Sequence, residues 1–198
     1  MNKIERLVLA TGNKGKYDEF RALLPRSFIG ELTFAPDIGR ALTAPIEENG
    51  ATYEDNALIK ARAWAAASGL PSLADDSGIE AEALNGAPGI HSARIVPGTD
   101  IDRNNWLLEQ LAGKTNRRGR FVAALALVVP GKWELICRGE CPGRIDKSPS
   151  GSGGFGYDPL FIPDGFDVSF AELPAEKKNE ISHRAAALRL MFEVLGQR

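Results

Sequence analysis

The sequence has few of the residues that mark zinc-binding, secreted or membrane-spanning proteins. Its 198 residues include only two cysteines, Cys137 and Cys141, and two histidines, His91 and His183, at unrelated positions. A zinc site at the cysteine pair would need two further ligands close by, so two reduced thiols are expected, as in a reducing compartment. No apolar run approaches the roughly 20 residues of a membrane span. The short apolar run near the N-terminus breaks at Thr11 and Gly12, unlike a signal peptide. These absences predict a cytoplasmic protein.

The chain also lacks an excess of charge of either sign. Its formal net charge is -2, which argues against a nucleic-acid polymer or an anionic membrane as partner. An anionic ligand must therefore be bound by a few local cations. With 43% hydrophobic and 25% charged residues, the composition is that of a soluble globular protein. The length predicts one domain, residues 1–198, large enough to bury a core.

Strand-like and helix-like segments alternate along the chain, which predicts a layered α/β fold. Expected strands cover residues 6–11, 32–35 and 71–74, and a hairpin is expected around Pro130 and Gly131. Expected helices cover residues 16–24, 52–68, 100–112 and 182–195. Thr52 with Asp55, and Thr99 with Asp102, match helix start signals. In the helix 52–68, Asn56 and Lys60 are four residues apart and share a face.

The first candidate binding segment is the turn "TGNKGK" at residues 11–16, between an expected strand and an expected helix. A glycine-rich turn of this kind exposes backbone N–H groups at a helix N-terminus and can bind an anion. Lys14 and Lys16 add positive charge. The turn is not a Walker A loop, because Ala10 replaces the first glycine and Tyr17 follows the lysine. A plain turn with two solvated lysines remains the alternative.

Two acidic pairs supply candidate metal ligands. Asp75-Asp76 follows the expected strand 71–74, and Glu47-Glu48 lies in the loop before the helix 52–68. Carboxylates without a Cys/His set suit a hard cation, Mg²⁺ above all. Successive strand residues point to opposite faces, so one aspartate is expected to face the site and the other to support it. Solvated loop carboxylates are the alternative.

A third group lies near the C-terminus, where Lys178, His183 and Arg184 surround the start of a helix that Ser182 can cap. Cations are disfavoured at a helix N-terminus by the macrodipole. Their presence there indicates an anionic or acceptor-rich ligand. The alternative is a solvated basic patch.

The fourth segment, "GSGGFG" at residues 151–156, matches the dinucleotide-binding fingerprint letter for letter. The context excludes that function, because Pro159 and Pro163 prevent the helix that the fingerprint requires. What remains is a flexible loop that presents Phe155 and Tyr157. Their rings are expected to form a stacking platform for a planar base. Core aromatics of a strand are the alternative.

Taken together, five segments resemble the inosine triphosphate pyrophosphatase family: "LATGNKGKYDEF", "NALIKARAWA", "LADDSGIEAEALNGAPGIHSARI", "GGFGYDPLFIP" and "KKNEISHRAAAL". They occur in the family's order from residue 7 to about residue 190. The resemblance implies an elongated mixed β-sheet flanked by helices, two lobes around a central cleft, and a homodimer. It also implies Mg²⁺-dependent cleavage of dITP, ITP and XTP, purine nucleotides with deaminated bases, to the monophosphate and pyrophosphate.

The resemblance implies roles for individual residues as well. Asp76 matches the catalytic base, and Asp76 with Glu47 matches the metal ligands, although the neighbouring Glu48 is a second choice. The implied substrate-binding residues are Thr11, Gly12, Asn13, Lys14, Gly15, Lys16 and Lys60 for the phosphates, Ser77 as a further substrate contact, and Phe155, Gly156, Tyr157, Asp158, Lys178, His183 and Arg184 for the base. Two rival functions stay open: a Mg²⁺-dependent phosphatase that removes the γ-phosphate, and a non-catalytic nucleotide-binding regulator.

Overall fold

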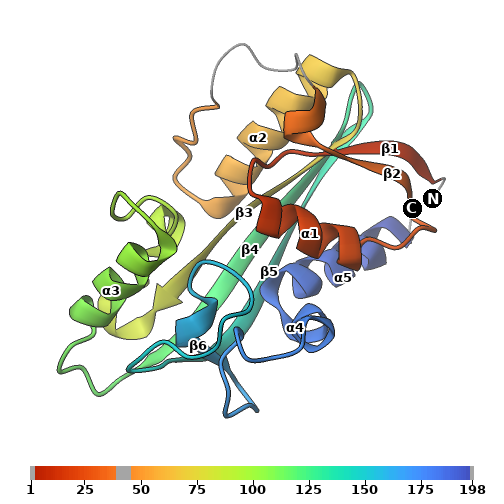
Figure 1. Cartoon of the computed structure of the whole chain (residues 1–198). Coiled ribbons are helices and arrows are strands. Elements are labelled where there is room, and N and C mark those ends of the chain that lie inside the picture. Colours follow the sequence, from red (N-terminus) through yellow and green to blue (C-terminus); the bar gives the residue numbers. More distant parts are fainter. Residues whose placement is uncertain (1–2, 39–45, 197–198) are drawn as a thin grey trace. The chain divides into compact units, whose positions relative to one another are not determined.

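The chain forms an α/β structure built on one six-stranded sheet (Figure 1). The computed structural model describes residues 3–38 and 46–196. The strands are β1 (Ile4–Leu9), β2 (Ile29–Phe34), β3 (Ser72–Ala81), β4 (Arg118–Val129), β5 (Trp133–Ile145) and β6 (Phe161–Pro163). The α-helices in this part of the chain are α1 (Lys14–Leu23), α2 (Tyr53–Ser68), α3 (Asp100–Gln110), α4 (Ala175–Ile181) and α5 (His183–Gly196).

The sheet is mixed, as the family resemblance implies. Its strand order is β2-β1-β3-β4-β5-β6, with β1 parallel to both β2 and β3, and β5 antiparallel to β6. The expected hairpin joins β4 to β5. Its turn is closed by a 3.0 Å hydrogen bond from the Lys132 N–H to the Val129 carbonyl. Gly131 has a φ of 68° in this turn, where a side chain would be strained.

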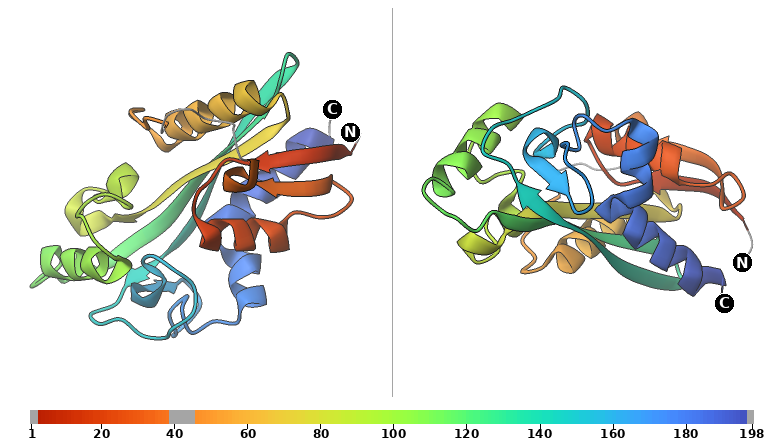
Figure 2. Two further views of the ribbon diagram at one scale, coloured as in Figure 1. Left: turned by 45° about the horizontal axis from the view of Figure 1, so that its top comes forward. Right: turned by 90° about the horizontal axis from the view of Figure 1, so that it is seen from below.

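The chain divides into two compact units. Unit 1 comprises Met1–Asp76, Ala123–Gly139 and Ala187–Arg198. Its core joins Leu7 and Leu9 of β1, Phe20 of α1, Leu125 of β4 and Met191 of α5. Helix α2 lies on the other side of the sheet from α1 and the end of α5 (Figures 1 and 2). Both faces of the sheet in unit 1 are therefore covered by helices.

Unit 2 comprises Ser77–Val122 and Glu140–Ala186. Its core contains Leu107 of α3 and a cluster of aromatic rings. The ring of Phe121 meets that of Phe161 edge-on at 4.7 Å and stacks near that of Phe170 at 5.8 Å. The buried thiol of Cys141 belongs to the same core. No helix in the described ranges 3–38 and 46–196 has the length and apolar character needed to cross a bilayer.

Several sequence predictions are confirmed and one strand prediction is wrong. Capping boxes form at the starts of α2, through Thr52 and Asp55, and of α3, through Thr99 and Asp102. The expected strand 71–74 is too short, because β3 continues to Ala81. The polar residues after position 74 remain in the strand since their side chains find partners on both faces of the sheet. Helix α4 was not expected from the sequence.

Candidate active site

The two adjacent aspartates of β3 have different partners in unit 1. The Asp75 carboxylate lies 2.6 Å from the Lys16 ammonium of α1. The Asp76 carboxylate accepts hydrogen bonds from the Asn56 amide at 3.2 Å and from the Lys60 ammonium at 3.3 Å, both on α2. Since α1 and α2 lie on opposite sides of the sheet, the alternation expected from the sequence is confirmed.

Lys60 connects Asp76 to the acidic loop that precedes α2. Its ammonium lies 2.7 Å from the Glu48 carboxylate and 3.3 Å from that of Asp76. Burial lowers the pKa of Lys60, but the charges of Asp76, Glu48 and Asp75 outweigh this and raise it above the ordinary value. Lys60 is therefore a permanent cation held between two carboxylates.

Burial of the Asp76 side chain raises its pKa above the ordinary value, although Lys60 and Lys16 oppose the change. A carboxylate with a raised pKa is a stronger base than one in water. A raised pKa in a carboxylate with fixed hydrogen-bond partners, here Asn56 and Lys60, is typical of catalytic acids and bases. These properties of Asp76 are those of a general base.

Sequence reasoning missed Asn56 as a member of this group. Its side chain is fully buried, donates to Asp76, and accepts a 2.8 Å hydrogen bond from the Gly50 N–H. The available signal was the spacing of Asn56 and Lys60, which share a helix face. Both side chains on that face of α2 donate hydrogen bonds to Asp76.

The turn at residues 11–16 is organised by Asn13. This residue caps α1, and its side-chain oxygen accepts a 3.0 Å hydrogen bond from the Lys16 N–H. The helix starts at Lys14, two residues earlier than predicted, because this cap fixes its first turn. The two lysines point to different partners: Lys14 pairs with Asp18 on its own helix, whereas Lys16 pairs with Asp75. Of the two lysines, Lys16 is therefore the one that contacts the acidic pair Asp75-Asp76, through Asp75.

The carboxylates near Lys60 suit a hard divalent cation. Glu47 is exposed, and Glu48 is the neighbour that contacts Lys60. Within the described residues, no cluster of three or more His, Cys, Asp and Glu side chains could hold a metal ion. The carboxylates of Asp76 and Glu48, which both contact Lys60, are fewer than three but are of the type that Mg²⁺ binds. Mg²⁺ is usually bound by one or two carboxylates, waters and the phosphates of a substrate.

In unit 2, Asp158, Lys178 and Arg184 converge on the loop that contains Phe155. The Phe155 N–H donates a 2.8 Å hydrogen bond to the buried Asp158 carboxylate. The Lys178 ammonium lies 2.5 Å from the same carboxylate and 5.1 Å from the centre of the Phe155 ring. Asp158 and Lys178 thus form a buried ion pair beside this ring.

The start of α5 supplies a second cation near the Phe155 ring. The Arg184 guanidinium donates a 2.8 Å hydrogen bond to the Ser77 hydroxyl and lies 5.3 Å from the centre of the Phe155 ring. The Ser182 hydroxyl accepts from the Ala185 N–H at 3.2 Å, as expected for a helix cap. His183 stacks on Phe121, with ring centres 4.8 Å apart. Arg184 therefore joins Ser77 to the Phe155 loop, while the His183 ring packs in the core.

The expected platform of two side-by-side rings is wrong. Gly154 and Gly156 have φ values of 70° and 63°, so the chain turns here and is not extended. Tyr157 is buried in the core, and its hydroxyl donates a 2.8 Å hydrogen bond to the Ser92 carbonyl. Phe155 is half-buried and is the more accessible ring of the two. The prediction that no α-helix follows Gly156 is confirmed, because a short 3-10 turn and β6 follow it.

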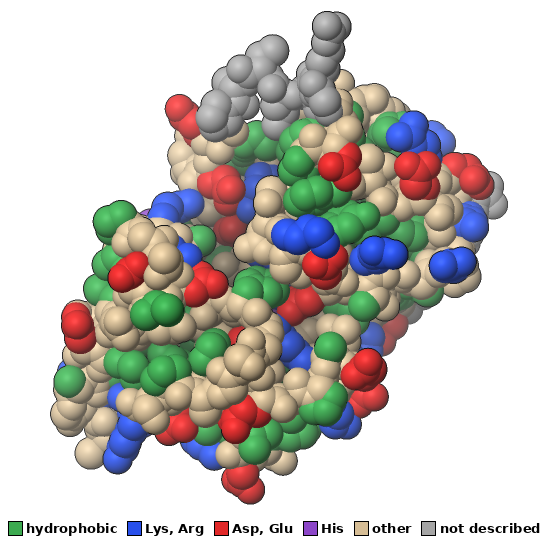
Figure 3. Space-filling model, viewed as in Figure 1, with side chains coloured by type: hydrophobic (Ala, Val, Ile, Leu, Met, Phe, Trp, Pro, Cys, Tyr) green, Lys and Arg blue, Asp and Glu red, His purple; other side chains and the backbone are tan. Residues whose placement is uncertain are grey.

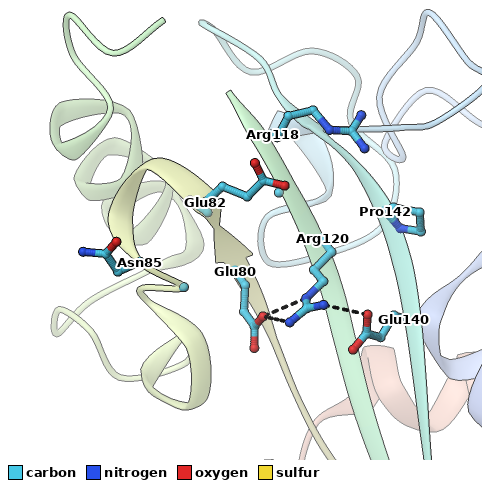
Figure 4. Close-up of a pocket in the computed structure, with 10 residues that line it drawn as sticks. Glu80, Glu82, Asn85, Arg118, Arg120, Glu140 and Pro142 are labelled. Carbon is cyan, nitrogen blue, oxygen red and sulfur yellow. Dashed lines mark hydrogen bonds and ion pairs between the residues drawn. The ribbon is translucent and has the colours of Figure 1, made fainter. Parts of the chain in front are cut away.

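A separate hollow of unit 2, about 740 Å³ in volume, contains none of the predicted site residues. It is lined from β3, β4 and β5 by residues that include Glu80, Arg118, Arg120 and Glu140 (Figure 4). Arg120 pairs with Glu80 at 2.8 Å and with Glu140 at 2.9 Å, so its charge is already compensated.

On the face shown in Figure 3, described side chains of both signs are interspersed.

Comparison with known proteins gives consistent matches over nearly the whole chain. The Ham1 family matches residues 7–194. A "dITP/XTP pyrophosphatase" of Symbiobacterium thermophilum is 49% identical over 195 residues, which cover 96% of this chain and 95% of the relative. One of Deinococcus radiodurans is 48% identical, covering 98% and 94%. The structure of a HAM1 protein from Coxiella burnetii superposes with a TM-score of 0.85 at 38% identity, covering 98% of this chain and 100% of that one.

Proposed function

The chain belongs to the Ham1 family, and from this premise we propose that it hydrolyses dITP, ITP and XTP to the nucleoside monophosphate and pyrophosphate. The observation that carries the proposal is the buried Asp76 carboxylate, held by Asn56 and Lys60. In the proposed reaction Asp76 orients and deprotonates a water molecule that attacks the α-phosphorus. Pyrophosphate is the leaving group. No covalent intermediate is required, and both thiols are buried.

The charge of the triphosphate is balanced in this proposal by Lys16, Lys60 and the N–H groups of the turn at residues 11–16. Mg²⁺, when bound, supplies further positive charge to the phosphates. Asp76 with Glu47 or Glu48 would hold it. Glu48 and Asp76 both contact Lys60 and so lie near each other, which favours Glu48 as the second ligand. The family resemblance instead favours Glu47.

The base is read through hydrogen-bond polarity. Hypoxanthine and xanthine present an acceptor, the C6 carbonyl, where adenine presents an amino donor. The Arg184 guanidinium carries only donors. Adenine would leave these donors unpaired, and such a mismatch is worth roughly 10⁴-fold in discrimination. The Phe155 ring, beside Arg184, is the proposed stacking surface for the purine.

We propose that residues 1–198 act as a single catalytic domain. Asp76 and Ser77, which belong to different units, are consecutive in the sequence. We further propose a homodimer, to be tested by sedimentation equilibrium, and a cytoplasmic location, where nucleotide pools are found.

The test is a panel of nucleoside triphosphates assayed with Mg²⁺ and separate detection of pyrophosphate and orthophosphate. Pyrophosphate release from ITP, dITP and XTP, with far less from ATP, supports the proposal. Orthophosphate release would instead support a γ-phosphatase. Nucleotide binding without any turnover would support a regulator.

A further inference from the structure

We infer that Asp100 and Asn104 of α3 are positioning residues for base recognition, acting through the backbone of Gly156. The Gly156 N–H donates a 2.8 Å hydrogen bond to the Asp100 carboxylate. The Gly156 carbonyl accepts a 3.1 Å hydrogen bond from the Asn104 side-chain amide. We call this pair of contacts the Gly156 clamp. The inference rests on the proposed function, because it concerns the same base-binding loop.

The clamp holds a segment that would otherwise be mobile. Gly156 has a φ of 63° and lies in a run rich in glycine, which loses much conformational entropy when ordered. Three successive peptide groups around Phe155 are bonded to side chains: the Phe155 N–H to Asp158, the Gly156 N–H to Asp100, and the Gly156 carbonyl to Asn104. The backbone on both sides of the Phe155 ring is therefore fixed.

The helix that makes the clamp is itself held rigidly at its first turn. Asp100 and Asn104 are four residues apart and project from one face of α3. Arg103 pairs with Asp100 at 2.5 Å and donates to the Gly98 carbonyl at 3.0 Å. Asn104 is 6% exposed, whereas the Asp100 side chain is 46% exposed. Asn104 is therefore the less solvated of the two contacts.

The ring that the clamp positions lies beside the cations that read the base. Phe155 has Arg184 at 5.3 Å and Lys178 at 5.1 Å from its ring centre. If Gly156 is loosened, the Phe155 ring can move away from Arg184. The purine can then no longer stack on Phe155 and bind Arg184 through its C6 carbonyl at the same time. Loss of the clamp is expected to weaken binding through the base and leave binding through the phosphates unchanged.

The experiment measures KM and kcat for ITP, and the inhibition constant of inorganic tripolyphosphate, which has no base. The variants are Asn104→Ala, Asp100→Ala and Asp100→Asn, with Asn105→Ala as matched control because Asn105 is an exposed asparagine of the same helix. A net hydrogen bond changes an equilibrium by about 2- to 12-fold. We expect Asn104→Ala to raise KM about 3- to 10-fold with kcat nearly unchanged, and the inhibition constant to stay as in wild type. Asp100→Asn keeps an acceptor for the Gly156 N–H and should be less affected than Asp100→Ala.

Three results separate the possibilities. A KM for Asn104→Ala equal to that of Asn105→Ala refutes the clamp, as does an equal rise in the tripolyphosphate constant. If Asn104→Ala does not fold, the half-exposed Asp100→Ala and Asp100→Asn pair decides the question by the same criteria. Failure of the wild-type chain to release pyrophosphate from ITP would refute the proposed function itself.

Discussion

Replacing Asp76 by asparagine separates its catalytic role from its structural role. Asparagine has nearly the same shape, but its single side-chain oxygen can keep only one of the two hydrogen bonds that the separate Asp76 oxygens accept from Asn56 and Lys60, and it cannot take a proton from water. We expect kcat for ITP to fall by at least about 10²-fold. Stability should be preserved, because burial already disfavours the charged form of Asp76, as its raised pKa indicates, and Lys60 keeps its pair with Glu48.

The size of the stability change follows from the same contacts. A change of 1 kcal/mol moves Tm by about 2–4 °C in a chain of this length. We therefore expect Asp76→Asn to unfold within a few degrees of wild type, or slightly above it. The assays are steady-state pyrophosphate release and thermal unfolding followed by circular dichroism.

Asp75→Asn is the matched control, since it alters the neighbouring carboxylate of the same strand. It removes the charge that pairs with Lys16, an interaction between a fully buried side chain and a mostly buried one. A hydrogen bond to a charged group contributes about 1.5–3 kcal/mol, so Tm should fall by roughly 3–12 °C. Its kcat should fall far less than that of Asp76→Asn. Equal kcat losses in the two variants, or wild-type turnover by Asp76→Asn, would refute the assignment of the base.

Three further outcomes are expected. Of Glu47→Gln and Glu48→Gln, the variant that removes the metal ligand should raise the Mg²⁺ concentration for half-maximal rate at least several-fold; an unchanged value in both would place the metal elsewhere. Arg184→Ala should narrow the ITP-to-ATP ratio of kcat/KM, and an unchanged ratio would mean that the base is read by other residues. Burial raises the pKa of Cys137, and burial with the nearby Asp164 raises the pKa of Cys141 to about 12. Because both thiols are buried and their pKa values are raised, a thiol reagent at pH 8 should label the native chain only after denaturation. Rapid labelling of the native chain would contradict that burial.

Local signals in the sequence were enough to predict the helices and the hairpin. Capping residues such as Thr52 and Thr99 act on the backbone a few residues away, so their effect can be read from spacing alone. The end of β3 could not be read in this way. Whether "DDSG" continues a strand depends on Lys16 and Lys60, which come from other elements and compensate the buried aspartates.

The candidate site shows the same division. Asp76 and Lys60 were identifiable, because their residue types and segments carry the chemistry. The burial of Tyr157 and the Gly156 clamp were not, since both depend on contacts over 50 residues or more of sequence. The sequence pattern predicts an extended backbone around Phe155, but the positive φ values of Gly154 and Gly156 make the chain turn there.

The most direct measurement is hydrolysis of ITP in water labelled with ¹⁸O, followed by mass spectrometry of both products. Attack by an Asp76-activated water at the α-phosphorus predicts one labelled oxygen in the monophosphate and none in the pyrophosphate. Label in pyrophosphate or in orthophosphate would mean that water attacks another phosphorus and would contradict the proposed reaction.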